Sequence, residues 1–205
     1  MTFIDIHTHN STAEKAIFNS SKAYVAGKNI SMGIHPWEID GNWECEFAAI
    51  AEFAKAENVV AIGECGFDTL KSPATLELQE KIFRLHAGLA EEMEKPLIIH
   101  CVKAFDTLIA LHKELSPKQP WIIHGFRGKP QMAEQLSKAG FHISLGEKFN
   151  TESARAIPTE QLFIESDESR CPIADIYAAI AVAKGVSAED LARQLRINSR
   201  IFRQF

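Results

Sequence analysis

Two histidines near the start of the chain are spaced to bind one metal ion. His7 and His9 lie in the largely apolar run 3–9, which is typical of a β-strand. Because alternate residues of a strand project from the same face, both imidazoles would point the same way, and paired imidazoles are frequent zinc ligands. A His-x-His pair also arises by chance in short apolar runs, so this pair alone does not establish a metal site.

Four further apolar runs lead to residues that could complete the same site. The runs 59–62, 97–99, 121–123 and 162–166 lead to Glu64, His100, His124 and Asp167 respectively. Continuous apolar runs of this length are typical of buried parallel strands. Four imidazoles and two carboxylates exceed what one zinc ion needs, and mixed nitrogen and oxygen ligands favour two neighbouring divalent ions.

The elements that must position these residues alternate along the chain. Seven strands are expected at 3–9, 29–34, 59–62, 97–99, 121–123, 141–145 and 162–166, with an eighth near Ile17 or Tyr24. Helical patterns follow at 43–57, at 72–93 with Ser72 as its N-cap, after His100, at 130–139, at 173–184 and from Ser187. This alternation predicts an α/β fold, a compact TIM-type (β/α)8 barrel that is irregular around its second strand.

In such a barrel the carboxyl ends of all strands face one mouth, so the six potential ligands would converge there. An open, doubly wound sheet is the alternative architecture. It is disfavoured because no glycine-rich phosphate loop follows the first strand.

Composition limits the organisation and the partners of the protein. A chain of 205 residues with 46% hydrophobic content predicts one domain, residues 1–205. The formal net charge of -5 gives no general attraction to nucleic acid or to an anionic membrane, so phosphate binding would rely on metal ions or a few basic side chains. Four scattered cysteines, no signal-peptide pattern and no apolar run near 18 residues predict a cytoplasmic protein that does not enter membranes.

The motifs as a group resemble those of the TatD-type metal-dependent hydrolases, which are amidohydrolase-like barrels. The matching pieces occur in the family's order and cover nearly the whole chain. They are 5–9, 33–36, 62–68, Gln79 with Phe83, 96–100 with Ala104, 124–128, 165–167, and Asn198 with Phe202.

The resemblance implies a dinuclear metal centre and deoxyribonuclease or related phosphodiester activity. By position it implies that one ion is bound by His7, His9, Glu64 and Asp167, and the other by Glu64, His100 and His124. We expect two divalent cations as cofactors, and these ligand types do not decide among zinc, manganese and magnesium.

The chain departs from the family pattern where a substrate would bind. The family often has an arginine where this chain has Val102, a proline where it has Ser169, and a cysteine where it has Gly125. Glu168 adds negative charge beside Asp167, and the segment 10–28 looks short for the family. The metal binding of the family can therefore be expected of this chain more readily than the family's substrate.

Two residues are candidates for the chemistry itself. Asp167 would orient or deprotonate the attacking water, and Glu64 would bridge the two ions. Neither a serine nor a cysteine with a neighbouring base is evident, so direct attack by water is preferred to a covalent intermediate.

Four further residues are candidates for binding the substrate: His35, Lys103, Phe126 and Arg127. Each has an ordinary structural alternative. A histidine before proline can anchor a loop, exposed lysine and arginine side chains are commonly solvated, and a phenylalanine is chiefly a packing residue, although Phe126 at the mouth could stack on a base.

The functional hypothesis is a metal-dependent hydrolase, a two-metal phosphodiesterase or deoxyribonuclease in which activated water attacks the ester. Its expected partner is DNA or a small phosphate ester, and no protein partner is evident. One alternative is a small-molecule amidohydrolase or lactonase that uses the same metal site on a carbonyl. The other is a catalytically silent metal-binding protein.

Overall fold

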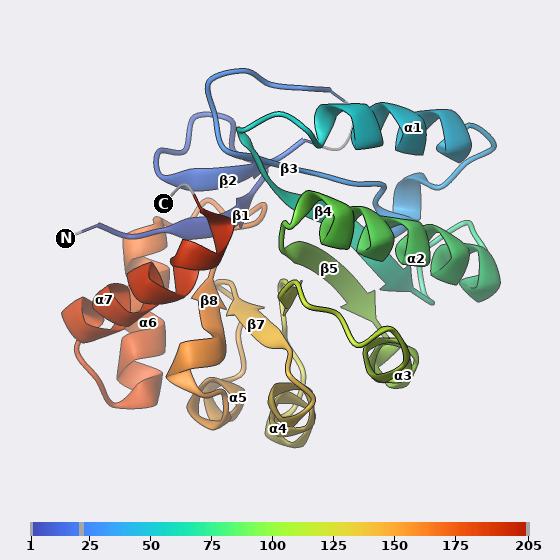
Figure 1. Cartoon of the computed structure of the whole chain (residues 1–205). Coiled ribbons are helices and arrows are strands. Elements are labelled where there is room, and N and C mark those ends of the chain that lie inside the picture. The colour runs from blue at the N-terminus through green and yellow to red at the C-terminus, as the bar shows by residue number, and fades with distance from the viewer. Residues whose placement is uncertain (1, 21–22, 204–205) are drawn as a thin grey trace. The chain divides into compact units, whose positions relative to one another are not determined.

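The structure of the protein, a computed structural model, describes residues 2–20 and 23–203 (Figure 1). The strands among these residues are β1 (Asp5–Thr8), β2 (Ala16–Asn19), β3 (Ile30–Met32), β4 (Val59–Asp68), β5 (Leu97–Val102), β6 (Trp121–Ile123), β7 (His142–Leu145) and β8 (Leu162–Ile164). The α-helices are α1 (Trp43–Phe53), α2 (Leu76–Met93), α3 (Phe105–Leu115), α4 (Pro130–Lys138), α5 (Thr151–Ala156), α6 (Ile173–Lys184) and α7 (Ala188–Asn198). Three short 3-10 helices are η1 (Pro36–Glu38), η2 (Thr159–Gln161) and η3 (Ser199–Phe202).

The strands confirm the predicted fold class. Within the described residues, eight strands follow one another in the sheet in chain order, and the pairings β1–β2, β3–β4, β4–β5 and β7–β8 are parallel. Parallel strands connected through helices are the defining pattern of α/β barrels. The uncertain strand is β2, at Ile17 rather than at Tyr24, and its register with β1 shifts between Asp5 and Thr8.

The chain divides into two compact units, residues 1–18 with 123–205 and residues 19–122. In the unit of residues 19–122, β3, β4 and β5 are paired, and α2 packs on β4 and β5 (Figure 1). All ten residues of β4 are buried. The prediction of a single domain over 1–205 stays a prediction.

Glycines let β4 approach β5 unusually closely. A Cβ atom on Gly63 would lie 2.2 Å from the Ile98 carbonyl oxygen, and one on Gly66 would lie 2.1 Å from the His100 carbonyl oxygen. Both glycines also have positive φ angles, which side-chain-bearing residues rarely adopt. Only glycine fits these two positions, one on each side of Glu64.

In the other unit, β8 connects to β1 through the bridge between Thr8 and Asp167. The helices α6 and α7 lie side by side (Figure 1). The Tyr177 hydroxyl of α6 donates a hydrogen bond to the Ile4 carbonyl at 2.8 Å, and the Asn198 amide of α7 donates one to the Leu162 carbonyl at 2.9 Å. These buried bonds tie α6 to the residue before β1 and α7 to the first residue of β8.

Two expectations about element boundaries are wrong. The N-cap of α2 is Thr75, whose hydroxyl accepts from the Leu78 N–H at 3.3 Å, whereas the Ser72 hydroxyl donates to the Pro36 carbonyl at 2.6 Å. The strand β4 does not end before Glu64 but continues to Asp68, because its later residues still pair with β5. The carboxylate of Glu64 therefore projects from within a strand.

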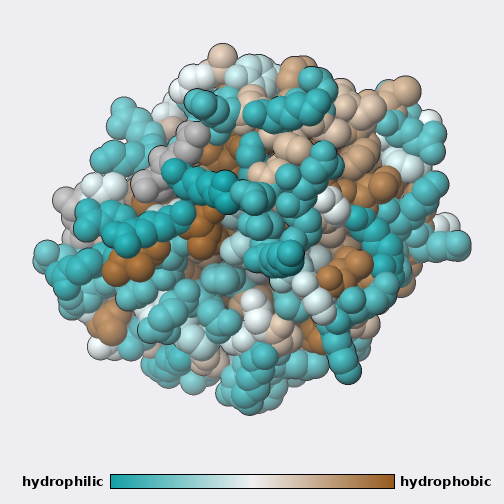
Figure 2. Space-filling model, viewed as in Figure 1, coloured by the Kyte–Doolittle hydropathy of each residue, from teal (hydrophilic) through white to brown (hydrophobic). Residues whose placement is uncertain are grey.

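The surface in Figure 2 is mainly polar, and hydrophobic residues gather in small separate groups on that face. Scattered apolar residues of this kind are usual on protein surfaces. Among the described helices, none combines the length and the apolar character that crossing a membrane requires.

Candidate metal centre

Glu64 of β4 is the centre of a cluster in the unit of residues 19–122. Its side chain is only 4% exposed. Glu64 Oε1 lies 3.1 Å from His35 Nε2 and 2.9 Å from His100 Nδ1, and these two nitrogens are 3.2 Å apart. The cluster thus brings potential ligand atoms of His35, Glu64 and His100 close enough together to bind one ion.

Asn19, at the end of β2, holds the other side of Glu64. Its amide nitrogen donates to Glu64 Oε2 at 3.2 Å, and its amide oxygen accepts from the Glu64 backbone N–H at 3.3 Å. The Ser31 hydroxyl also donates to that oxygen at 3.3 Å. These bonds leave Glu64 Oε1 directed at the imidazoles.

Asp68, at the end of β4, orients His100. Asp68 Oδ2 lies 3.3 Å from His100 Nε2 and accepts from the Trp37 indole N–H at 2.7 Å, while Oδ1 accepts from the Leu70 and Lys71 backbone N–H groups at 2.8 and 2.9 Å. Burial acts to raise the pKa of Asp68, but these hydrogen bonds outweigh it and lower the pKa below its ordinary value. Asp68 is therefore a carboxylate that accepts four hydrogen bonds.

The partners of His100 assign its tautomer. Because Asp68 is ionised, the Nε2 atom of His100 carries the proton, and the lone pair of Nδ1 faces Glu64. A histidine that donates its second N–H to a carboxylate is the usual arrangement at metal sites. Glu64 Oε1 and His100 Nδ1 are then two acceptors 2.9 Å apart, and a cation bound by both would remove their repulsion. The donor set fits a divalent ion.

His35 differs from His100 in this respect. Its Nδ1 accepts from the Trp37 backbone N–H at 3.1 Å, so in the neutral ring Nε2 carries the proton. That proton points at Glu64 Oε1, 3.1 Å away. His35 is thus arranged as a hydrogen-bond donor to the cluster.

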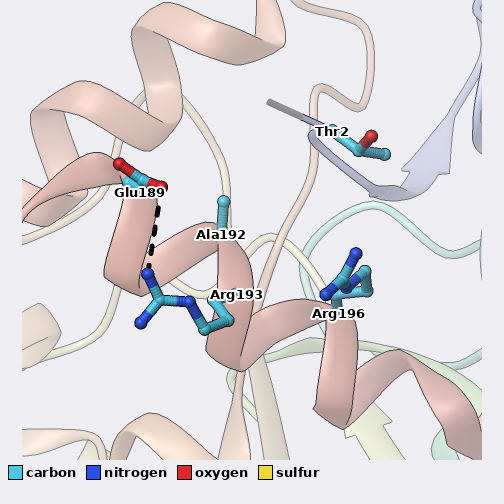
Figure 3. A pocket seen from close by; sticks show the side chains of 5 residues that line it. All are labelled: Thr2, Glu189, Ala192, Arg193 and Arg196. Atoms are coloured by element: carbon cyan, nitrogen blue, oxygen red, sulfur yellow. Dashed lines mark ion pairs between the residues drawn. The ribbon is translucent and has the colours of Figure 1, made fainter.

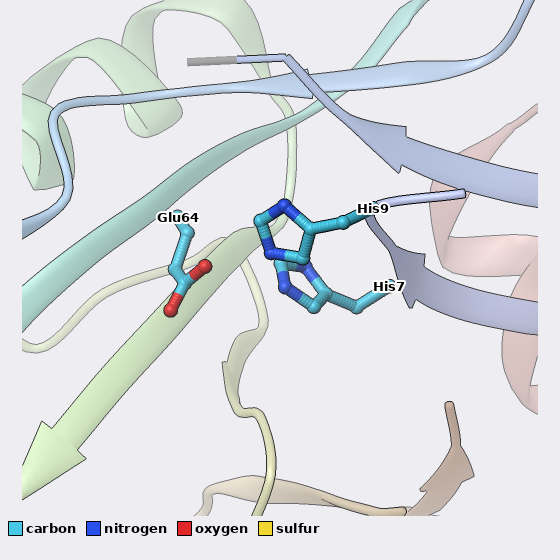
Figure 4. Close-up of side chains that lie close together, drawn as sticks. All are labelled: His7, His9 and Glu64. Atoms are coloured by element: carbon cyan, nitrogen blue, oxygen red, sulfur yellow. The ribbon is translucent and has the colours of Figure 1, made fainter. Parts of the chain in front are cut away.

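A second cluster lies in the unit of residues 1–18 with 123–205. Figure 4 shows the imidazoles of His7 and His9 projecting together from the end of β1, and it also draws Glu64 of β4. Asp167 Oδ1 lies 3.9 Å from His7 Nε2 and 3.6 Å from His9 Nε2. The ring of His124 is 4.4 Å from that of His7 between centroids. Three imidazoles and one carboxylate therefore gather here.

Backbone pairing places Asp167 beside these histidines. The Asp167 N–H donates to the His7 carbonyl at 2.9 Å, and the His9 N–H donates to the Asp167 carbonyl at 3.1 Å. Buried Asp5 supports the same strand ends by accepting from the Ser166 hydroxyl at 2.5 Å and the Ser166 N–H at 3.0 Å. Burial raises the pKa of Asp5 to about 6, although the bonds from Ser166 oppose the shift.

Glu165 orients the imidazole of His124 in the way that Asp68 orients that of His100. Its side chain is fully buried, and its Oε1 lies 3.2 Å from His124 Nδ1. Burial acts to raise the pKa of Glu165, but the attraction and hydrogen bond of His124 lower it. With a carboxylate at Nδ1, Nε2 is the nitrogen of His124 that could act as a ligand atom, which again is the arrangement found at metal sites.

An open pocket of about 750 Å³ adjoins this second cluster. His9 and Asp167 line it together with Glu14, Glu168 and Arg170. Apart from Arg170, the charged groups named here are acidic or imidazole, so the pocket offers little attraction for several phosphates at once.

A smaller hollow of about 140 Å³ beside α7 has a different character (Figure 3). It is lined by Thr2, Glu189, Ala192, Arg193 and Arg196. Arg193 lies 3.9 Å from Glu189 and donates to Asp190 at 3.0 Å, so its charge is engaged within the helix. None of the predicted metal ligands lines this hollow.

A family model for TatD-related DNases matches residues 2–203 of the chain. The chain belongs to the TatD family. The metal-dependent hydrolase YcfH of Escherichia coli K12 is 29% identical over 195 residues, which cover 84% of this chain and 72% of YcfH. The 3'-5' ssDNA/RNA exonuclease TatD of Klebsiella pneumoniae is 33% identical over 155 residues, which cover 71% of this chain and 59% of that protein.

Two solved structures of TatD-family proteins have the same fold. The TatD homologue YJJV of Escherichia coli K12 superposes on this chain with a TM-score of 0.82 at 20% identity. The superposed residues cover 98% of this chain and 97% of the YJJV chain. A TatD-family hydrolase of Entamoeba histolytica gives a TM-score of 0.78 at 18% identity, with the same coverage. The predicted family and TIM-type barrel class are confirmed, and the protein is a metal-dependent hydrolase of the TatD family.

The predicted ligands fall into the two clusters described above, and their roles as ligands stay predictions. Of the predicted substrate-binding residues, His35 lies in the Glu64 cluster, and Lys103 and Arg127 are exposed. Phe126 is only 2% exposed and packs against Gly128, which favours the packing alternative for its ring.

Three residues of the clusters were not singled out from the sequence. Glu165 is a carboxylate inside an apolar strand two residues before Asp167, and Asp68 follows Glu64 by four residues, so both had a usable signal. Asn19 had none, because it lies in the segment whose pattern was weakest.

Proposed function

We propose that this TatD-family hydrolase is a two-metal phosphodiesterase whose substrate is DNA or a small phosphate ester. The observation that carries the proposal is that two histidines, His100 and His124, are each held by a buried carboxylate. This arrangement fixes the ring and raises its strength as a ligand, which a purely structural histidine does not need.

We assign the ligands by combining the clusters with the family pattern. His7, His9, Glu64 and Asp167 would hold one ion, and Glu64, His100 and His124 would hold the other, with zinc, manganese and magnesium all compatible. When bound, such ions lower the pKa of a water molecule and offset charge on a phosphate.

The protein side chains supply the remaining steps. Asp167 is the most accessible of the carboxylates and takes the proton of the attacking water at its carboxylate. His35 directs its Nε2 proton into the cluster and can donate to a phosphate oxygen. Lys103 and Arg127, exposed on the loops after β5 and β6, would pair with the phosphate.

The choice of a phosphodiester rests on chemistry and on relatives. Carboxylate and imidazole ligands to two ions suit in-line displacement at phosphorus. One relative is named a 3'-5' ssDNA/RNA exonuclease, which supports a nucleic-acid substrate. The acidic pocket beside Asp167 favours a second candidate, hydrolysis of a small neutral amide or lactone at the same site.

The test is turnover after metal reconstitution on single-stranded DNA, a small phosphodiester and a carboxyl ester. Asp167→Asn and His100→Ala should abolish phosphodiester cleavage, as should a chelator, whereas Asp106→Asn on the exposed start of α3 should not. Cleavage of the carboxyl ester alone would move the protein to the small-molecule hydrolases. Silence on all three substrates with metal bound would contradict the proposal.

A further inference from the structure

An exposed aromatic ring stands directly beside the Glu64 cluster. Trp37, on η1, is 44% exposed, which is unusual for so large an apolar side chain. Its ring centroid lies 4.7 Å from that of His35 and 5.6 Å from that of His100, with both imidazoles steeply inclined to it. A group bound on Trp37 would therefore lie next to the proposed catalytic atoms.

The ring is held in place from several sides. Its indole N–H donates to Asp68 at 2.7 Å, and its backbone N–H donates to His35 at 3.1 Å. The Ser72 hydroxyl fastens the preceding residue, Pro36, at 2.6 Å. A ring that is already fixed loses little conformational entropy when a ligand stacks on it, so it is a suitable binding surface.

The turn after β4 completes this surface. The Lys71 ammonium lies 4.4 Å from the centroid of the Trp37 ring, and neighbouring Leu70 is 68% exposed. Asp68 fixes the backbone of both residues. We call Trp37, Leu70 and Lys71 the Trp37 platform. A lysine stacked on an exposed ring gains only about 0.5–1 kcal/mol, so another group can displace it.

We propose that the Trp37 platform binds an unpaired nucleobase adjacent to the phosphodiester that is cleaved. The base takes the place of the Lys71 ammonium on the indole, and the ammonium then pairs with the neighbouring phosphate. In a duplex the faces of the bases are already stacked, so the platform selects single strands. This inference rests on the proposed function and gives its substrate class.

Base stacking also fits the charge of the protein. A chain with a formal net charge of -5 does not attract a polyanion through its overall field. A neutral base offers an aromatic face whose binding does not depend on charge. The platform would thus supply affinity that the electrostatics of the protein do not.

The experiment compares a single-stranded oligonucleotide with an abasic strand of the same length. We define selectivity as the ratio of their kcat/KM values with the metal-loaded enzyme. Trp37→Ala should lower this ratio by about 5- to 150-fold, the range that loss of one base–aromatic stack gives. Trp37→Phe should lower it less, because it keeps an aromatic face. Trp43→Ala is the matched control, since Lys81 lies 4.9 Å over the Trp43 ring on α1, and it should leave the ratio unchanged.

Two outcomes would overturn the inference. Equal losses on both strands would leave the ratio unchanged and mean that Trp37 acts only by supporting Asp68 and His100. Wild-type kcat/KM values on both strands would mean that no base stacks there. If the wild type cleaves neither strand but cleaves a small phosphodiester, DNA is ruled out as the substrate while the proposed two-metal chemistry stands, and binding still decides the role of Trp37. Tryptophan fluorescence of the Asp167→Asn protein, measured with the same metal ions in solution, should be quenched by the base-bearing strand and not by the abasic one. The quenching should be lost with Trp37→Phe in the same background.

Discussion

Replacement of Asp68 by asparagine exchanges one oxygen for an NH2 group at the point where the proposed metal ligand His100, an aromatic ring and a turn are joined. The carboxylate accepts bonds from the Trp37 indole at 2.7 Å, the Leu70 and Lys71 backbone at 2.8 and 2.9 Å, and His100 at 3.3 Å. Asparagine keeps the shape but has one acceptor oxygen and one NH2 donor. Its NH2 group must therefore face N–H groups on one side.

The effect of the substitution depends on the direction in which the asparagine amide nitrogen points. Toward the turn, it would leave the Leu70 and Lys71 N–H groups without this acceptor, and because both are only partly buried the cost for each lies below the about 1–3 kcal/mol of a fully buried group. Toward His100, the imidazole can switch tautomer and accept, but its proton then moves to Nδ1 and points at Glu64. The second choice removes the lone pair that faces the cluster. Loss of a hydrogen-bond partner that orients a metal ligand typically weakens metal binding by about 10- to 100-fold.

Isothermal titration of Zn²⁺ or Mn²⁺ into chelator-treated protein measures the effect. We expect Asp68→Asn to weaken the binding of one ion by about 10- to 100-fold, and Asp106→Asn to have no effect. Thermal unfolding of the metal-free proteins shows whether the variant remains folded. A folded Asp68→Asn protein that binds both ions with wild-type affinity would refute the assignment of His100 as a ligand oriented by Asp68.

Three further changes test other parts of the structure. Burial lowers the pKa of His86 to about 4, so below about pH 6.5 the unfolded chain binds a proton that the folded protein does not. Above about pH 6.5 neutral His86 therefore contributes on the order of 3 kcal/mol to the free energy of unfolding, and this stabilisation is lost as the pH falls from about 6.5 to 4. Urea unfolding should show a shallower pH dependence of stability for His86→Gln, and identical slopes for the variant and the wild type would contradict the reasoning. Gly66→Ala would bring its Cβ to 2.1 Å from the His100 carbonyl oxygen, so soluble folded protein should be largely lost on expression, and a wild-type melting temperature would show that β4 and β5 can separate. Arg127→Ala should raise KM for a phosphodiester by about 3- to 10-fold with kcat little changed, as expected for an exposed cation that pairs with phosphate, and steady-state kinetics that show only a fall in kcat would remove Arg127 from substrate binding.

The order of strands was predictable because buried parallel strands leave continuous apolar runs. Val59–Ile62 and Leu97–Ile99 are such runs, and each lies in a strand of the structure. The second strand was uncertain because only two residues of β2 are buried, Ile17 and Asn19, and one of them is polar. Strand signals depend on burial, so a short strand with a polar buried residue gives little signal.

The partners that orient the proposed ligands were harder to predict from the sequence than the candidate ligands themselves. Asp68 was expected beyond the end of its strand, but the close approach of β4 to β5 at Gly63 and Gly66 keeps the strand paired as far as Asp68. The hydrogen bond from Asn19 to Glu64 joins residues 45 positions apart, and the pattern of the sequence does not indicate such a pairing. Local periodicity predicts which face a side chain takes, whereas its partner depends on the register between strands.

The two histidines with carboxylate partners explain how an acidic protein can present a site for a phosphate ester. Asp68 and Glu165 are buried and ionised, and each directs its negative charge at an imidazole rather than at solvent. Their charge therefore strengthens ligands for cations, and the bound cations in turn would meet the anionic substrate. The acidity at the site is thus compatible with phosphodiester hydrolysis, because the charge that the substrate meets is set by the ions and not by the net charge of the chain.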